Sequence, residues 1–351
     1  MGDNIMNRNT NRYIHTLAIV FLLAACSQSN EDVSSEESAV NQVSMSDEYH
    51  ISLVHEEDRS QIQVFIDGAH FTSYHYGNEF KKPILYPLIS AGGATITRGF
   101  PIDPREGEKE DHPHQVGLWL NYGDVNGLDF WNNSNAISEE RRSEYGTIHH
   151  KSINQMKSGN ERGELEVTKE WVNSEGEVLL IENTTYIFSG NESMRSIDRL
   201  TNLQSSGEEV SLDDNKEGMI GIRMARELEH PDEHDEATGM YRSSEGIEGH
   251  EAWGTRAKWM SLSGEINGET VSVAILDHPD NVGYPTYWHA RGYGLFAANP
   301  LGMKEMSGGE EELNFVLGAE DTLTFKHRII LYSGEETDDS VIESDWQQFI
   351  R

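Results

Sequence analysis

The chain has 351 residues, with 61 Asp and Glu against 27 Lys and Arg, which gives a formal net charge of −34 at pH 7. Nucleic acids are bound by basic surfaces, so this charge excludes nucleic acid as a partner. The single cysteine, Cys26, excludes a disulfide framework and a zinc–thiolate cluster.

The N-terminus has the pattern of a lipoprotein signal peptide over residues 1–25. A basic start is followed by the apolar run 17–25, which is too short to span a bilayer. The run ends in "LAAC", a lipobox in which Cys26 becomes the lipidated, palmitate-carrying first residue; a plain secretory signal is the alternative. Residues 26–47 are rich in Ser, Glu, Asn and Gln and predict a flexible tether. We therefore expect an exported lipoprotein of the cell envelope, in the outer membrane or facing the periplasm, that contacts the membrane only through its lipid.

Residues 48–351 are predicted to form one β-domain. The segments 51–68, 163–190 and 321–334 alternate apolar and polar residues and are divided by turn residues. A helical pattern is best at the C-terminus, over 339–351, and it is short. Many strands at close spacing predict an all-β fold, a large antiparallel β-sandwich with few short helices. Two irregular segments, 98–115 and 226–254, are predicted to be functional loops.

The stretch "DHPHQVGLWLNYGDVNGLDFW" places two histidines on either side of a proline. Proline excludes a helix interior, so we expect His112 and His114 in extended chain, facing the same side. The pair could share a divalent metal, or one histidine could act as acid or base while the other orients substrate. Trp131 and Asp124 follow and are assigned to substrate binding, although Asp124 also fits a turn.

Two further stretches combine charge with apolar residues. In "DDNKEGMIGIRMARELE", Lys216 and Glu217 are candidate catalytic residues. Arg223 lies within an apolar run and needs a carboxylate partner, from the substrate or from the protein. In "EAWGTRAKWMSLSG", Arg256 is a candidate substrate ligand, with a structural ion pair as the alternative.

The stretch "YPTYWHARGYGLFAANPLG" mixes aromatic and charged side chains with glycines. Aromatic faces bind sugar rings, while histidine and arginine reach hydroxyls or a carboxylate. We therefore assign Tyr287, Trp288 and Arg291 to substrate binding and His289 to catalysis. His289 and Arg291 share one side of an extended chain, and the alternative is a core strand.

These stretches resemble the signature blocks of a bacterial family of unknown function, whose members are often labelled, misleadingly, as methane oxygenase PmoA. The matching blocks are "HPHQVGLWLNYGDVNGLDFW", "NKEGMIGIR", "WGTRAKWMSLSG" and "YPTYWHARGYGLFAANPLG". The resemblance implies a galactose-mutarotase-like supersandwich in exported proteins associated with polysaccharide breakdown. Family members commonly have "HPHH", where this chain has Gln115. No catalytic residue is carried over from the family.

The leading hypothesis is a carbohydrate-active enzyme that eliminates water or a glycosyl group from oligosaccharides of an acidic polysaccharide. Elimination beside a uronate needs a cation for the carboxylate, a base and an acid. Arg223, Arg256 and Arg291 are candidates for the cation, and His112 and His289 for base and acid.

Three alternatives stay open. Hydrolysis, for which Glu217 and Asp124 are the candidate carboxylates, and epimerisation are other reactions for the same residues. A non-catalytic glycan-binding surface lipoprotein needs only the aromatic wall and the arginines. A metal-assisted enzyme would use His112 and His114 with a carboxylate, although no cofactor is required by the sequence.

Overall fold

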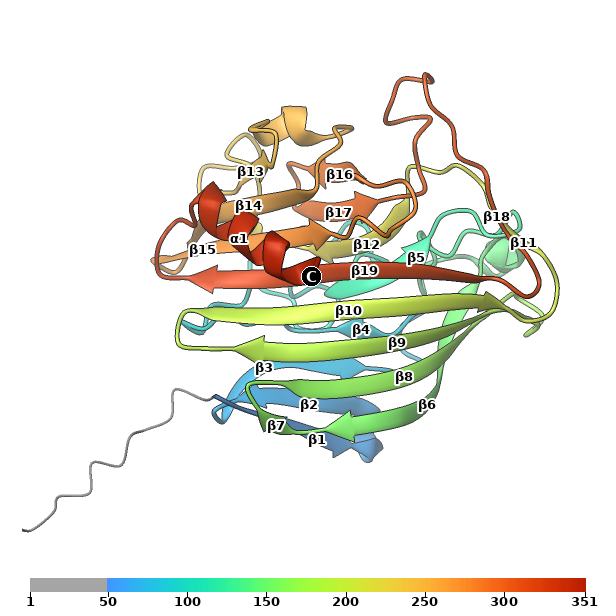
Figure 1. Cartoon of the computed structure of the whole chain (residues 1–351), viewed down its shortest axis with the longest axis horizontal. Helices are drawn as coiled ribbons and strands as arrows, with labels where there is room; N and C mark the ends of the chain where they lie inside the picture. The colour runs from blue at the N-terminus through green and yellow to red at the C-terminus, as the bar shows by residue number, and fades with distance from the viewer. Residues whose placement is uncertain (1–48) are drawn as a thin grey trace, which may run out of the picture. The chain divides into compact units, whose positions relative to one another are not determined.

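The computed structural model describes residues 49–351, so the predicted signal peptide, Cys26 and the whole predicted tether (26–47) lie outside the described residues. Most of the described strands belong to two large sheets whose paired strands are antiparallel, which confirms the predicted all-β sandwich with few short helices (Figure 1). No helix among residues 49–351 is long and apolar enough to cross a membrane.

The first sheet has nine strands. In sheet order these are β16 (Tyr287–Arg291), β17 (Leu295–Asn299), β12 (Gly218–Arg223), β5 (Leu118–Tyr122), β4 (Ile84–Leu85), β3 (Ala69–His75), β2 (Gln61–Ile66), β1 (His50–Glu56) and β7 (Gly159–Asn160). Strand β16 is therefore an edge strand.

The second sheet has eight strands. In sheet order these are β13 (Met240–Ser243), β14 (Trp259–Ile266), β15 (Glu269–Asp277), β19 (Thr322–Ser333), β10 (Met194–Ser205), β9 (Val178–Gly190), β8 (Gly163–Val172) and β6 (Thr147–Lys157). A small third sheet pairs β11 (Val210–Leu212) with β18 (Phe315–Leu317).

The core lies between the two large sheets. Along β8 and β9 buried residues alternate with partly exposed ones, as expected of strands that face a core on one side only. Phe71 on β3 meets Phe188 on β9 edge to face, with ring centroids 6.3 Å apart, so the inner faces of the two sheets are in direct contact.

Strands at the β16 end of the first sheet are buried on both faces. All five residues of β5 and β17 and all six of β12 are buried. A second apolar cluster, which includes Trp119, Trp131 and Leu295, accounts for this burial. Loops therefore cover this end of the sheet and can hold side chains over it.

Helical structure is short. The 3₁₀ turns are η1 (Glu57–Arg59), η2 (Glu139–Glu144), η3 (Arg226–Leu228) and η4 (Gly249–Ala252). The predicted C-terminal helix is confirmed as α1 (Asp339–Phe349). It buries Ile342 and Trp346 in an apolar cluster with residues of β14, β15 and β19 in the second sheet (Figure 1).

Candidate active site

A cavity of about 430 Å³ lies beside the edge strand β16. Its lining side chains are ionisable or polar-tipped with one exception, a glycine. The lining residues are His112, Lys216, Glu217, Glu233, His250, His289, Arg291, Gly292 and Tyr293. Five residues singled out from the sequence, His112, Lys216, Glu217, His289 and Arg291, therefore meet at one place, although they come from three distant segments.

The loop that carries His112 is held by the buried side chain of Arg98. The Arg98 guanidinium donates to the backbone oxygens of Asp111, His112 and Gln115 at 2.9, 3.1 and 3.0 Å. His112 has a left-handed backbone conformation, with φ of 44°. The predicted extended chain at 112–114 is therefore wrong, because the loop turns around the arginine.

His112 forms a dyad with the preceding aspartate. Its Nδ1–H donates to Asp111 Oδ2 over 2.9 Å, and its ring stacks on Tyr293 at 5.1 Å between centroids. Asp111 Oδ1 accepts from Arg98 and Arg223, each at 2.8 Å. Burial acts to raise the pKa of Asp111, but Arg223, His112 and Arg98 together hold it below its ordinary value. His112 Nε2 is consequently the unprotonated nitrogen, which suits it to act as a base.

Arg223 supports the site from behind. Its side chain is fully buried, donates to Gln115 Oε1 at 2.6 Å and to Asp111 Oδ1 at 2.8 Å, and lies 4.7 Å from the Tyr293 ring centroid. The carboxylate partner that its apolar surroundings demand is supplied by the protein. The assignment of Arg223 to substrate binding is therefore corrected to a positioning role.

His289 is fixed at both ring nitrogens. Nδ1–H donates to the backbone oxygen of Lys216 at 3.1 Å, and Nε2 accepts from Arg291 Nε at 3.2 Å. Burial, aided by the charge of Arg291, lowers the pKa of His289 to about 3. A neutral imidazole with both nitrogens engaged orients its neighbour, so the predicted catalytic role is corrected to positioning of Arg291.

Arg291 presents a free cationic group to the cavity. Its guanidinium lies 4.4 Å from the ring centroid of Trp253. Within residues 49–351 its Nη atoms have no hydrogen bond or ion pair, since its one hydrogen bond goes from Nε to His289. An arginine that is held on an aromatic face and has unpaired Nη atoms is suited to bind a carboxylate through two hydrogen bonds.

Lys216 and Glu217 contribute an ammonium group and a carboxyl group to the cavity lining. Lys216 Nζ lies 2.9 Å from Glu305 Oε1. Burial raises the pKa of Glu217 despite the nearby Lys216. No described residue hydrogen-bonds the Glu217 carboxyl, and the neutral ring of His289 lies near it, with Nδ1 at 3.9 Å from Oε2. A carboxyl group with a raised pKa is suited to donate a proton.

His114 lies away from this cavity. It lines a separate cavity of about 150 Å³ together with Lys82 and Pro113. Its Nε2 has no hydrogen-bond partner among the described residues, and burial lowers the pKa of His114 to about 2. The rings of His112 and His114 are 5.7 Å apart and nearly perpendicular. The predicted metal site shared by His112 and His114 is therefore corrected, because the two side chains line different cavities.

The predicted aromatic wall is part of the core. Trp288 is 0% exposed, and its Nε1–H donates to the Ala257 carbonyl at 3.0 Å. Trp131 is likewise buried and packs on Trp119 with centroids 5.2 Å apart. Both assignments to substrate binding are corrected, because both rings are buried and neither lines the cavity. Alternation along β16 turns Trp288 inward when His289 faces the cavity.

Three other predicted ligands have structural roles. Arg256 lies 5.0 Å from the centroid of the Tyr287 ring and pairs with Glu311 at 2.8 Å, which is the ion pair considered as its alternative. Asp124 Oδ1 accepts from the Gly127 amide at 2.9 Å and closes a turn. Arg256, Tyr287 and Asp124 are therefore corrected to structural residues outside the cavity.

Three lining residues were not singled out from the sequence: Glu233, His250 and Tyr293. Glu233 and His250 belong to the irregular segment 226–254, whose length and composition did predict a functional loop. Tyr293 lies in the turn between β16 and β17. Spacing along the chain carries no signal for these contacts, because loop closure brings them to the cavity.

The chain is thus a two-sheet β-protein in which β16 and the surrounding loops bring imidazole, carboxyl and cationic side chains together at one sheet edge. Residues 61–347 match the family described as a family of unknown function, DUF6807, and the chain belongs to that family. This agrees with the predicted resemblance to a family of unknown function. No curated protein sequence matches the chain.

Several solved structures share its fold distantly. The GH36 α-galactosidase AgaB from Geobacillus stearothermophilus is 10% identical, with 81% of this chain and 41% of that chain covered and a TM-score of 0.41. A galactose mutarotase-like protein from Clostridium acetobutylicum is 10% identical over 83% of this chain and 100% of that chain, with a TM-score of 0.40. A family 97 glycoside hydrolase from Pseudoalteromonas sp. strain K8, in complex with panose, is 11% identical over 83% and 35%, with a TM-score of 0.31. The chain thus spans less than half the length of the two hydrolases, and likeness at this level carries no information on activity.

Proposed function

We propose that this protein is a carbohydrate-active enzyme that performs acid/base elimination on an oligosaccharide bearing a carboxylate, such as a uronate. The observation that carries the proposal is Arg291, whose open guanidinium faces a cavity that also holds a base, His112, and an acid, Glu217. A carboxylate on the substrate would supply the missing partner of Arg291 and be neutralised by it.

The three residues divide the reaction between them. His112 Nε2 removes the proton next to the substrate carboxylate, and the imidazolium formed is stabilised by Asp111, which accepts its Nδ1–H. The electron pair forms a carbon–carbon double bond as the β C–O bond breaks. Glu217 donates its proton to the departing oxygen, which leaves as water or as a sugar hydroxyl. Arg291 balances the charge that builds on the carboxylate during proton removal.

Hydrolysis is the second candidate, because two carboxyl side chains, Glu217 and Glu233, line the same cavity. A pair of carboxyl groups flanking a glycosidic bond is the usual machinery of glycoside hydrolysis. In this alternative Glu233 replaces Asp124 as the second carboxyl group, because Asp124 lies outside the cavity. The engagement of Glu233 by Lys109, at 2.7 Å, favours elimination over hydrolysis.

Product masses distinguish these reactions. The protein is incubated with uronate-containing and neutral oligosaccharides and the products are read by mass spectrometry. We expect the loss of one water, or cleavage to an unsaturated product, from uronate-containing sugars only. Cleavage with gain of water would establish hydrolysis, and binding without any mass change would establish a glycan-binding protein.

Replacing Arg291 separates carboxylate binding from folding. We expect Arg291→Gln to reduce kcat/KM on uronate substrates by roughly 100-fold, since a charge-assisted contact in the transition state is lost. Arg256→Gln is the matched control, because Arg256 also lies on an aromatic ring but is paired outside the cavity. Equal losses in the two variants would remove Arg291 from the mechanism.

Export and lipidation are proposed on the lipobox at Cys26 alone. Metabolic labelling with palmitate should mark the wild-type chain and leave a Cys26→Ala variant unlabelled. Labelling of both chains, or of neither, contradicts the anchor.

A further inference from the structure

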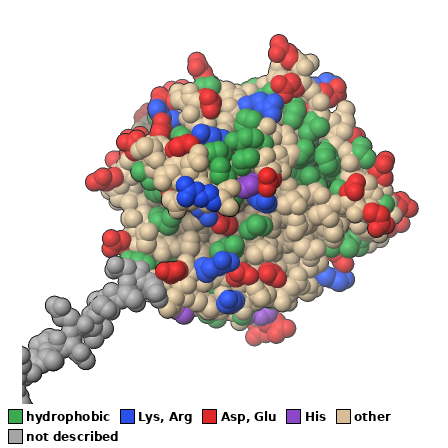
Figure 2. Space-filling model, viewed as in Figure 1, with side chains coloured by type: hydrophobic (Ala, Val, Ile, Leu, Met, Phe, Trp, Pro, Cys, Tyr) green, Lys and Arg blue, Asp and Glu red, His purple; other side chains and the backbone are tan. Residues whose placement is uncertain are grey.

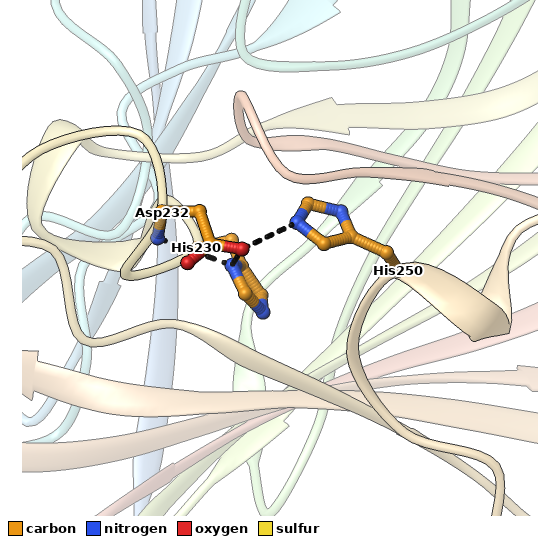
Figure 3. A group of neighbouring side chains, drawn as sticks. All are labelled: His230, Asp232 and His250. Atoms are coloured by element: carbon orange, nitrogen blue, oxygen red, sulfur yellow. Dashed lines mark hydrogen bonds and ion pairs between the residues drawn. The ribbon is translucent and has the colours of Figure 1, made fainter.

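Two histidines and an aspartate converge next to the candidate active site (Figure 3). His250 Nε2 lies 3.4 Å and His230 Nδ1 3.5 Å from one oxygen atom, Asp232 Oδ2. The two imidazole rings are only 4.0 Å apart between centroids. The three side chains come from the loop after η3 and from η4, so they are brought together by folding.

The separation between His250 and Asp232 is longer than a hydrogen bond. Hydrogen bonds between nitrogen and oxygen are about 2.7–3.2 Å long. Two ligands at ~2.0–2.1 Å from a tetrahedral zinc ion lie about 3.3–3.4 Å apart. The 3.4 Å between His250 Nε2 and Asp232 Oδ2 is therefore a separation that one zinc ion can bridge.

A matched turn elsewhere in the chain shows which contact is particular to this cluster. The sequence His-Pro-Asp occurs at 230–232 and again at 278–280. Both turns have the same local geometry: the aspartate amide donates to histidine Nδ1 at 3.2 and 3.1 Å, and Nδ1 lies 3.5 and 3.6 Å from the carboxylate. In the second turn Lys326 Nζ supplies a cation to Asp280 at 2.6 Å. In the first turn the corresponding partner is the second imidazole, His250.

Two imidazoles and one carboxylate are ligand types that suit a divalent transition-metal ion, and each of the three side chains offers one ligand atom to the cluster.

The cluster borders the cavity at His250, where a glycine leaves room. A Cβ atom on Gly292 would lie 2.6 Å from His250 Cε1 and 3.2 Å from His230 Cβ. A side chain at this position would therefore displace the His250 ring. Glycine at 292 leaves the room that His250 needs beside His230 and the cavity.

We propose that His230, Asp232 and His250 bind one divalent transition-metal ion of the zinc class, with a fourth position open to water or substrate. The proposed metal site can be tested separately from the proposed elimination, because metal binding is measured without any sugar.

The test is a titration with Zn²⁺. The purified full chain is stripped with a chelator and titrated calorimetrically as wild type, His250→Ala and Asp232→Asn, with His278→Ala as the matched control. We expect one tight equivalent in wild type and in the control, and at least ~10-fold weaker binding in the two ligand variants. His250 is about half exposed, so we expect its replacement to leave the fold intact, and circular dichroism of the variant checks this.

Two results would overturn the site. One is the absence of a tight Zn²⁺ equivalent in wild type. The other is binding by the folded His250→Ala and Asp232→Asn variants that equals the wild type. A rise in Tm on adding Zn²⁺, present in wild type and control and absent in the ligand variants, is the expected second readout.

Discussion

At the scale of single residues, the neighbours of each histidine decide what it can do. His112 donates one ring proton to Asp111 and keeps Nε2 open, whereas His289 has both nitrogens engaged. The same side chain is therefore suited to act as a base in one position and to support a neighbour in the other.

This difference predicts a split in kinetics. We expect His112→Gln to lower kcat on a uronate substrate by roughly 10²–10⁴, because a general base is lost, with KM little changed. His289→Gln should mainly raise KM, because it releases Arg291. Steady-state kinetics of the two variants check this, and a dominant kcat loss in His289→Gln would restore a catalytic role to His289.

The raised pKa of Glu217 sets a pH limit. A general acid works only while protonated, so the rate should fall as pH rises through the pKa of Glu217. Since burial raises that pKa, the fall should lie above the ordinary value of about 4.3. A pH profile of kcat/KM should show this limb in wild type, and Glu217→Gln should be slower and lack it. If Glu217→Gln keeps the fall in kcat/KM seen in wild type, that fall belongs to another ionisable group.

At the scale of elements, a loop depends on one buried side chain. Arg98 makes five hydrogen bonds to the 109–115 segment, including two to Asp111. The positions of His112 and Asp111 therefore depend on Arg98, which lies outside the cavity.

Removing this support should cost stability. We expect Arg98→Met to lower the free energy of unfolding by about 2–3 kcal/mol, since several carbonyl groups lose a buried donor. The control is Arg59, which is exposed and forms a surface ion pair with Glu56. Arg59→Met should change the free energy of unfolding by less than ~0.5 kcal/mol. Urea unfolding measures both, and similar values for the two variants would contradict the support role.

Sequence patterns predicted these elements unevenly. Alternation correctly placed His289 and Arg291 on one side of a strand and Trp288 on the other, yet period two does not say which side is buried. The proline between His112 and His114 indicated extended chain, but the distant Arg98 imposed a turn. Glu233 and His250 became neighbours of the cavity only through loop closure, which no local pattern encodes.

At the scale of the whole molecule, one buried carboxyl group ties several parts together. Asp277 at the end of β15 is 0% exposed and accepts from Asn281 at 2.7 Å and from the Thr286 amide at 2.9 Å. Its backbone oxygen accepts from Trp346 of α1 at 2.8 Å. Burial raises the pKa of Asp277 to about 7.

This raised pKa predicts how stability varies with pH. The unfolded chain releases the Asp277 proton near its ordinary pKa of about 3.9, while the native state keeps it until about pH 7. The contribution of Asp277 is therefore full below about pH 4 and declines as pH rises to about 7. Thermal unfolding of wild type and Asp277→Asn across this range should show a decline that the variant lacks, and parallel curves would contradict it.

The cations of the cavity sit in a molecule of strongly opposite sign. Arg291 and Lys216 line the cavity of a chain with net charge −34, and acidic side chains are spread over the face seen in Figure 2. An approaching anionic sugar is repelled at long range and attracted only within the screening distance, about 10 Å at 0.1 M salt. Association should therefore quicken as salt is first added, the reverse of ordinary electrostatic steering. If the ligand is the proposed anionic sugar, we expect its capture to be fastest at an intermediate salt concentration, where the repulsion is screened and the contact with Arg291 is not.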